Sequence, residues 1–209
     1  MKNNRNFFFY GIGSVAFGIK GNAFSWFLFF YYNIVIGLPA WMASLALAIA
    51  TIWDAISDLI IGYSSDHTKS RLGRRHPYMY AALIPVPIFF ILLWNPPTFD
   101  TDYNLFLYLL VMAILVRTFT TLFEIPNQSL GPEITREYHE RTKMMSLRYF
   151  FGWMGGTIMT ILMYFVFLKP TAEYPNGQLN PEGYEIYGFV AAIIMLVAMI
   201  ISSRGLNHL

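Results

Sequence analysis

Six long apolar segments, separated by short polar or proline-containing breaks, dominate the sequence and restrict the folds open to it. They lie near residues 7–36, 41–63, 77–95, 104–130, 145–168 and 184–203. A helix that crosses the hydrocarbon core of a bilayer needs about 20 apolar residues. We therefore predict an all-α membrane protein, with six transmembrane helices packed as a single bundle over residues 1–209.

The composition supports lipid as the surrounding solvent. Of the 209 residues, 56% are hydrophobic and 12% are charged, whereas soluble domains carry about 25% charged residues. Cysteine is absent, which excludes disulfides, thiolate metal sites and cysteine nucleophiles. The net charge of +2 gives no indication of a nucleic-acid partner. Because no nucleophile–base–orienter set is found, we expect neither an enzyme nor a cofactor.

The first apolar segment resembles a signal peptide only superficially. Its apolar part continues from Phe7 to Leu38, which is longer than the roughly 7–15 residues of a signal peptide core. We predict a retained membrane helix. The aromatic clusters at 7–10 and 27–32 are expected mainly to contact lipid and to anchor the helix at the interface.

Lysine and arginine predict the orientation, because cytoplasmic loops of membrane proteins hold them in excess. One side of the predicted bundle carries Lys2, Arg5, Lys69, Arg71, Arg74, Arg75, Arg136, Arg141, Lys143 and Arg204. The other side has Lys169 alone. We therefore expect both termini in the cytoplasm.

Six helices with both ends inside, and a basic loop after the second, suggest one half of a twelve-helix carrier. Such halves consist of two inverted three-helix repeats, although segments 7–95 and 104–203 show no convincing identity. The chain ends at Leu209, where a linker to a second half would begin. We expect a fragment or half-length product whose partner is the missing half or a second subunit.

Six ionisable residues lie inside the apolar segments. Charges at this depth are costly and are kept where they pair, line a cavity or bind an ion. Asp54 and Asp58 are one helical turn apart on the same face, and Asp58 and Glu124 both lie roughly 10 Å inside the cytoplasmic edge. The six residues are Lys20, Asp54, Asp58, Arg117, Glu124 and Arg148.

These carboxylates favour a cation site, since a cation without its water needs several oxygen ligands. Hydroxyls of Ser57, Thr120 and Thr121 could supply further oxygens. Na⁺ at Asp54 and Asp58 is one possibility, and a proton is the other. Alternatively, the six charges could form buried ion pairs that only hold helices together, such as Arg117 with Glu124 seven residues later.

Residues 53–58 read Trp-Asp-Ala-Ile-Ser-Asp, and a Gly-x-x-x-Asp motif with a later Gly-Arg-Arg-His-Pro follows within residues 62–77. This pattern resembles the glycoside–pentoside–hexuronide:cation symporters, the melibiose-carrier group of the major facilitator superfamily. Tyr10-Gly-Ile-Gly13, Glu124-Ile-Pro126 and Arg148-Tyr-Phe extend the resemblance along the chain. It implies the N-terminal six-helix half of such a carrier.

The resemblance also implies roles for individual residues in the coupling site. The cation site of the family would fall on Asp54, Ser57, Asp58, Thr121 and Glu124. An asparagine matches Ser57 in the melibiose carrier and an aspartate matches Glu124, so the oxygens are retained.

Solute contacts implied by the resemblance are Gly18, Glu124, Gln128 and Arg148. We add Lys20, which lies near the bilayer centre midway along the first segment. Gly18 replaces an acid that binds sugar hydroxyls, and Gln128 replaces a tryptophan that stacks on the sugar. Another glycoside, an oligosaccharide or a non-sugar solute therefore fits better than melibiose.

The loop after the second segment is expected to gate the cytoplasmic side. Its acid and its arginines could form charge pairs that hold that side closed in one state. The same arginines could instead serve only to set the topology. The gating residues are Gly62, Asp66, Arg71, Gly73, Arg74 and Arg75.

Together, these patterns predict a symporter coupled to Na⁺ or H⁺ that carries a sugar or glycoside-like solute by alternating access, in contact with membrane lipid. Two alternatives remain open. One is a carrier of a lysolipid-like or other non-sugar solute, and the other is a non-transporting six-helix scaffold or half-subunit.

Overall fold

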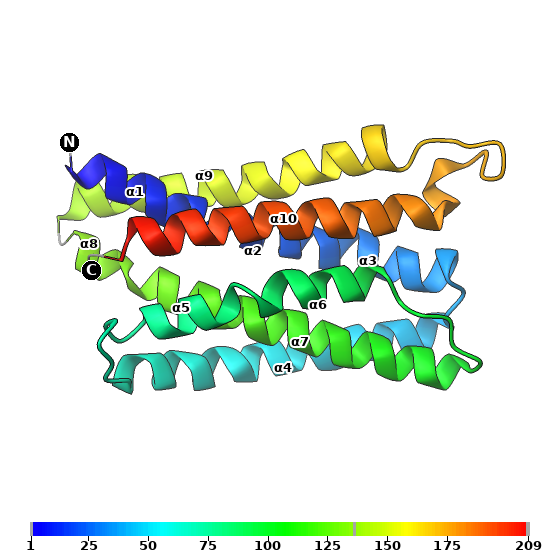
Figure 1. The fold of residues 1–209 in the computed structure, drawn as a ribbon, viewed down its shortest axis with the longest axis horizontal. Helices are drawn as coiled ribbons and strands as arrows, with labels where there is room; N and C mark the ends of the chain where they lie inside the picture. Colours follow the sequence, from blue (N-terminus) through cyan, green and yellow to red (C-terminus); the bar gives the residue numbers. More distant parts are fainter. Residues whose placement is uncertain (1, 136, 208–209) are drawn as a thin grey trace.

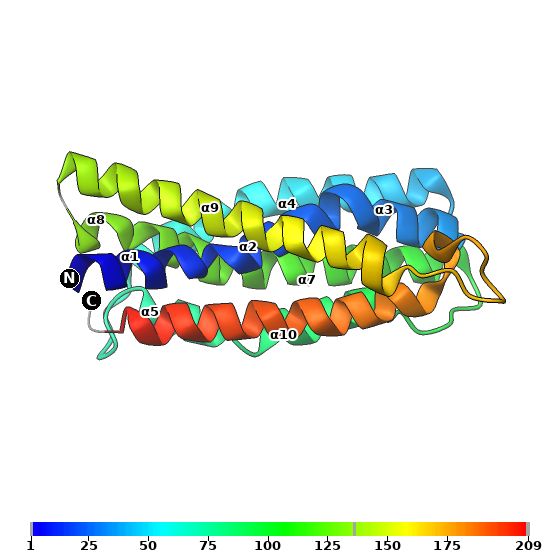
Figure 2. The same cartoon turned by 90° about the horizontal axis from the view of Figure 1, so that it is seen from above.

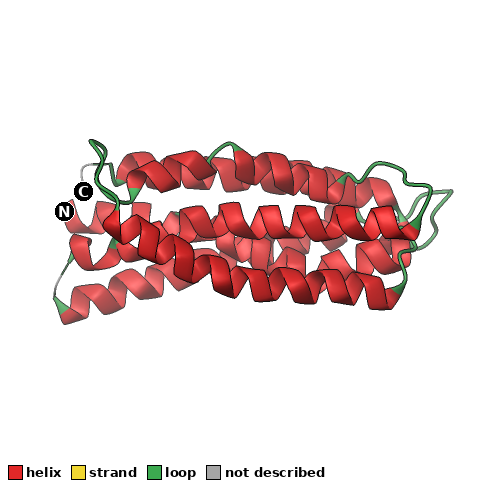
Figure 3. Cartoon of the chain, turned by 90° about the horizontal axis from the view of Figure 1, so that it is seen from below, coloured by secondary structure: helices red, strands yellow, loops and turns green. Residues whose placement is uncertain are grey.

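The computed structural model describes residues 2–135 and 137–207, and within these ranges all regular structure is helical (Figure 3). Arg136, used above to predict the orientation, and the chain end at Leu209 lie outside the described residues. The prediction of an all-α protein is confirmed.

Five helical stretches are long and apolar enough to span a membrane. The multi-pass prediction is therefore confirmed. The stretches are α4 (Ala40–His67), α5 with α6 (His76–Ala82 and Pro85–Trp94), α7 with α8 (Asp102–Ser129 and Gly131–Ile134), α9 with the π-helical η3 (Tyr138–Leu162 and Met163–Phe167), and α10 (Pro181–Gly205).

The first predicted segment consists of several short helical pieces. They are α1 (Lys2–Ile12), α2 (Ser14–Asn22), the π-helix η1 (Ala23–Phe27), α3 (Leu28–Phe30) and the π-helix η2 (Tyr31–Val35). π-Turns within α-helices often mark functional sites. Because this segment is not among the five stretches, the sixth spanning helix stays a prediction, as does the inverted repeat.

Several helix boundaries differ from the predicted ones. α4 continues to His67, so residues 64–67 are helical rather than part of the loop. α9 begins at Tyr138, seven residues before the predicted start at 145. The third segment divides into α5 and α6, and Pro85 begins the second piece, because proline lacks the N–H that would continue the helix.

The helices run along one common axis (Figures 1 and 2). α2 packs against α9, α4 against α7, and α6 against α10. The start of α1, the α4–α5 loop, α8 and the end of α10 all lie at one end of the bundle. This arrangement gathers the basic loop residues at that end, which we call the basic end.

α2 and α9 approach one another closely at two glycines. A Cβ atom on Gly18 would collide with the backbone carbonyl oxygen of Gly152. One turn away, the Ser14 hydroxyl donates to the Arg148 carbonyl over 2.5 Å. The contact therefore fixes α9 against α2 at the residue whose side chain enters the candidate site.

A cluster of aromatic rings fills the bundle at the end opposite the basic end. The Tyr31 and Tyr184 rings stack with 4.6 Å between centroids, and the Tyr31 hydroxyl donates to the Trp94 carbonyl over 3.1 Å. Tyr32 is also buried, whereas Phe29 is 39% exposed. The lipid-facing position expected for residues 27–32 therefore fits Phe29, but it is wrong for Tyr31 and Tyr32, whose hydroxyls bond to backbone carbonyls of α6.

Candidate functional site

Asp54 of α4 receives two positively charged partners from other helices. The Arg117 guanidinium of α7 forms an ion pair with Asp54 Oδ2, and Lys20 Nζ of α2 lies 3.6 Å from the same oxygen. Arg117 also donates to Thr51 over 3.1 Å and lies over the Phe24 ring at 4.6 Å. Ion pairs to Asp54 therefore link the first and fourth predicted membrane segments to the second.

Asp58 is held differently from Asp54. The Thr121 hydroxyl of α7 lies 3.0 Å from Asp58 Oδ1 and 3.3 Å from Asp54 Oδ1, so it bridges the two carboxylates. No ion pair within the described residues involves Asp58. The structure thus brings Asp54, Asp58 and Thr121 together as predicted.

Ser57 and Thr120 direct their hydroxyls into their own helices. Ser57 donates to the Asp54 carbonyl over 3.0 Å, and Thr120 donates to the Val116 carbonyl over 2.7 Å. Hydroxyls buried in apolar surroundings require such a partner. Both hydroxyls are therefore satisfied within their own helices, and neither donates to a carboxylate.

Glu124 belongs to a second charged group, separate from the Asp54–Asp58 pair. Its Oε1 lies 3.3 Å from Arg148 Nη2 of α9. Arg148 Nη1 is 3.5 Å from Asn127 Oδ1, and Asn127 donates to Ser202 of α10 over 3.0 Å. This buried network connects α7, α9 and α10 beside the cavity described below.

Glu124 makes no direct polar contact with the two aspartates or with Arg117 among the described residues. No hydrogen bond or ion pair between described residues joins Glu124 to Asp54 or Asp58. Arg117 does not pair with Glu124, because its side chain reaches α4 instead. Ion pairs thus divide the six charges at membrane depth into two groups, although the Lys20 charge also acts on Glu124.

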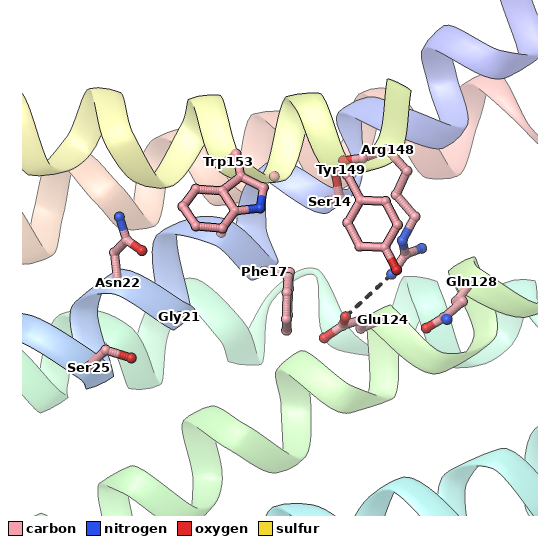
Figure 4. A pocket seen from close by; sticks show the side chains of 12 residues that line it. Ser14, Phe17, Gly21, Asn22, Ser25, Glu124, Gln128, Arg148, Tyr149 and Trp153 are labelled. Atoms are coloured by element: carbon pink, nitrogen blue, oxygen red, sulfur yellow. Dashed lines mark hydrogen bonds and ion pairs between the residues drawn. The ribbon is translucent and has the colours of Figure 1, made fainter. Parts of the chain in front are cut away.

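A cavity of about 440 Å³ lies between α2, α7 and α9 (Figure 4). Arg148 and Glu124 point toward one another at one side of it, with Gln128 nearby, and the rings of Phe17, Tyr149 and Trp153 lie around it. Gly18 also lines it, together with Ser14, Gly21, Asn22, Ser25 and Gly152. Hydrogen-bonding groups beside aromatic rings are suited to a solute that is both polar and ring-shaped.

The structure places the predicted solute-binding residues at two different positions. The cavity collects Gly18, Glu124, Gln128 and Arg148. Lys20 is buried beside Asp54 and is not among the lining residues. It belongs with the Asp54 group.

The basic loop forms charge pairs across the basic end. Arg75 Nη2 lies 3.3 Å from Asp66 Oδ1, and Arg75 Nη1 lies 3.0 Å from Glu133 Oε1 of α8. Arg75 also donates to the Ser129 carbonyl, and Arg74 pairs with Glu133 at 3.0 Å. The loop is thereby tied to the end of α4 and to the α7–α8 corner.

The other predicted gating residues have simpler surroundings. Gly73 adopts φ +84°, a left-handed conformation that favours glycine in this turn. Gly62 faces Ile125 of α7, where an added Cβ would make ordinary contact at 3.6 Å. Arg71 is exposed, and none of the ion pairs between described residues involves it.

Sequence reasoning missed Glu133, Asn127 and Trp153. Glu133 follows the Gly131-Pro132 break, and its position as the acid opposite a basic loop is a signal that could have been used. Trp153 lies one helical turn from Tyr149, so the two rings share a helix face. The bond from Asn127 to Ser202 depends on packing between distant segments and has no local signal.

Within the described residues, no group of three or more His, Asp or Glu side chains is arranged to hold a metal ion. Asp54 and Asp58 share only the Thr121 hydroxyl between them. A cation at this position would therefore have two carboxylates and one hydroxyl within reach.

Comparison with known proteins decides the family. A family model described as "MFS/sugar transport protein" matches residues 9–208. The chain belongs to this family. The resemblance to cation symporters of the major facilitator superfamily, and to the N-terminal half of such carriers, is thus confirmed. Members of the family are membrane transporters, which are generally not enzymes.

Three relatives illustrate the range of this MFS/sugar transport family. An uncharacterized symporter of Synechocystis sp. is 33% identical over 94% of the chain and 37% of its own length. The isoprimeverose transporter of Lactiplantibacillus pentosus is 27% identical over 93% of the chain and 39% of its own length. The sodium-dependent lysophosphatidylcholine symporter 1 of Xenopus tropicalis is 27% identical over 73% of the chain and 29% of its own length. The chain thus spans about two fifths, or less, of these relatives.

Proposed function

We propose that the protein carries a small polar solute across the membrane by alternating access, coupled to Na⁺ or H⁺. The observation that supports this most strongly is the presence of three carboxylates at membrane depth: Glu124 lines the cavity of about 440 Å³, and Asp54 and Asp58 lie on α4, where the Thr121 hydroxyl of α7 bridges them. Charged groups at this depth are costly unless they serve an ion or a solute. Asp54, Asp58 and Thr121 would form the coupling group, and Glu124 and Arg148 would face the solute.

The proposed solute is a sugar or glycoside. Arg148, Glu124 and Gln128 offer donors and acceptors for hydroxyl groups, and the Trp153 ring offers a surface on which a sugar ring can stack. The melibiose-type tryptophan expected at position 128 is absent, so Trp153 would take over stacking from α9. The name of the isoprimeverose transporter, a relative, is consistent with this class of solute.

A lysolipid-like solute is the second candidate. Arg148 could bind a phosphate, since guanidinium and phosphate match in geometry, and one relative is named for lysophosphatidylcholine. The polar side chains beside Arg148 favour the sugar, and the two candidates are separated by an uptake panel.

The proposed topology has six membrane helices arranged as two inverted three-helix repeats, and the basic end faces the cytoplasm. Both termini would lie there, in a bacterial inner membrane, following the distribution of lysine and arginine. The solute path would be completed by a second six-helix half or by another subunit. Arg75, paired with Asp66 and Glu133, would hold the cytoplasmic side closed in one state.

Uptake by the full-length protein in proteoliposomes tests this function. We expect a sugar or glycoside from a panel of sugars, glycosides and lysolipids to be taken up in response to a cation gradient. Asp58→Asn should abolish the dependence on that gradient. Uptake of no solute would favour a non-transporting scaffold, and unchanged coupling in Asp58→Asn would refute the assigned coupling group.

A further inference from the structure

The two charged groups differ in how their carboxylates are neutralised. Among the described residues, Glu124 forms an ion pair with one base, Arg148. Asp54 has two, Lys20 and Arg117, while Asp58 has the neutral Thr121 hydroxyl. The four charges of Lys20, Asp54, Asp58 and Arg117 therefore sum to zero without any added ion.

The two basic side chains are held firmly in place beside Asp54. The Lys20 side chain is 7% exposed and the Arg117 side chain is 14% exposed. Arg117 is fixed further by its bond to Thr51 and its position over the Phe24 ring. Both oxygens of Asp54 are engaged, because Oδ2 faces the two bases and Oδ1 receives the Thr121 hydroxyl.

We propose that Lys20 and Arg117 are tethered cations that occupy the place of Na⁺ beside Asp54 and Asp58, so that the protein binds no Na⁺ there and transports without Na⁺ dependence. The proposal deepens the proposed function, on which its transport part rests.

The reason is electrostatic. A free Na⁺ between Asp54 and Asp58 would lie close to two positive groups that cannot diffuse away, and charges a few ångströms apart repel strongly where water is scarce. Few oxygens would remain to coordinate it, because both Asp54 oxygens already contact Lys20, Arg117 or Thr121. The Ser57 hydroxyl is directed at a backbone carbonyl rather than at the two carboxylates. Asp58 and Thr121 then provide fewer oxygens than a hard cation needs.

The charged residues on the helices around Asp58 are consistent with a site that has no net charge. α2 contributes Lys20, and α7 contributes Arg117 and Glu124. Glu124 is in turn paired with Arg148 of α9, so it leaves no net charge for a further cation to neutralise. Removal of one tethered base would leave a net charge of about −1 at the Asp54–Asp58 pair and open a place for a small monovalent cation.

Equilibrium binding of radioactive Na⁺ to the purified full-length protein tests the proposal without any knowledge of the solute. We expect no saturable binding by the wild type in the millimolar range. Arg117→Gln should bind Na⁺ saturably, at least about tenfold more tightly than any residual wild-type binding. The matched variant Arg117→Lys keeps the charge and should not bind. Asp58→Asn added to Arg117→Gln should abolish the new binding.

Two results would overturn the proposal: saturable Na⁺ binding by the wild type, or no Na⁺ binding by a folded variant that lacks one base. Lys20→Gln provides a second such variant if Arg117→Gln does not fold, because Lys20 makes a single longer ion pair. Failure of the uptake panel would instead refute the transport function and leave this binding result unchanged.

Discussion

Arg148 of α9 and Glu124 of α7 form an ion pair with 3.3 Å between Nη2 and Oε1, and both side chains line the same cavity. The pair lies where the proposed solute would bind, so a solute hydroxyl could exchange hydrogen bonds with either partner. A solute bound there would therefore contact both α7 and α9 at the ion pair that links them.

Removal of the Arg148 charge should therefore have two separable effects. Arg148→Gln leaves Glu124 unpaired in a buried position, and loss of one partner of a buried pair typically costs about 3–5 kcal/mol. We expect a lower melting temperature and the loss of solute uptake. In the double variant Arg148→Gln with Glu124→Gln, the melting temperature should recover while uptake stays lost. Arg141 is exposed on the same helix, so the control variant Arg141→Gln should change neither the melting temperature nor the uptake. Recovery of uptake in the double variant would contradict a role of Arg148 and Glu124 in binding the solute.

The close contact between α2 and α9 provides a matched pair of glycine substitutions. Gly18→Ala places a methyl group against the Gly152 carbonyl, whereas a Cβ on Gly21 meets nothing within 4 Å. Overpacking of this kind costs about 1–3 kcal/mol, so Gly18→Ala should lower the melting temperature. Gly21→Ala should leave it unchanged or raise it, since alanine favours a helix. Equal melting temperatures would show that the two helices do not touch as described.

The arginines of the basic loop should differ in their effect on gating. The Arg75 side chain is 13% exposed and contacts Asp66, Glu133 and Ser129, whereas the Arg74 side chain is 56% exposed and contacts Glu133. Arg75→Ala should open the basic end more often than Arg74→Ala.

The measurement is the rate at which a membrane-impermeant maleimide labels Gln128→Cys, a cavity position, from the cytoplasmic side. The 209 residues contain no native cysteine, so labelling reports that position alone within this chain. We expect a faster rate with Arg75→Ala. Equal labelling rates in both arginine variants would indicate that these residues only set the topology.

Trp153 is predicted to act as a stacking surface for a sugar ring. Trp153→Ala should weaken binding of the transported solute about two- to tenfold, and Trp153→Phe should restore much of the affinity, since an aromatic contact contributes about 0.5–1.5 kcal/mol. Binding is measured by competition in an uptake assay. Phe165→Ala serves as the control, because Phe165 is also exposed but does not line the cavity. An equal loss in the control would indicate a general effect of exposed aromatic residues.

The sequence was informative wherever the physical constraint was local. Apolar length predicted the membrane-spanning stretches, and the one-turn spacing of Asp54 and Asp58 predicted their shared face, now bridged by Thr121. Helix ends were less accurate: α9 begins before position 145 because polar residues from Tyr138 onward also form helix.

Partner choice among the charges could not be deduced from the sequence. Arg117 and Glu124 are seven residues apart on one helix, yet each pairs with a different neighbouring helix. The choice depends on where α4 and α9 lie relative to α7 in the bundle, which no local pattern specifies. Lys20 was considered both as a solute contact and as a possible partner of the Asp54 segment, and its place on the first segment could not decide between them; it contacts Asp54.

Solute accumulation in proteoliposomes under an imposed gradient tests the central claim most directly. The full-length protein would be given an inward proton gradient, once with Na⁺ and once with Na⁺ replaced by an inert organic cation. Our account predicts accumulation of a sugar or glycoside above its external concentration, equal in both media and lost when an ionophore collapses the gradient. Failure of every solute to accumulate would contradict coupled transport. Accumulation that required Na⁺ would contradict the proposal that Lys20 and Arg117 take the place of Na⁺.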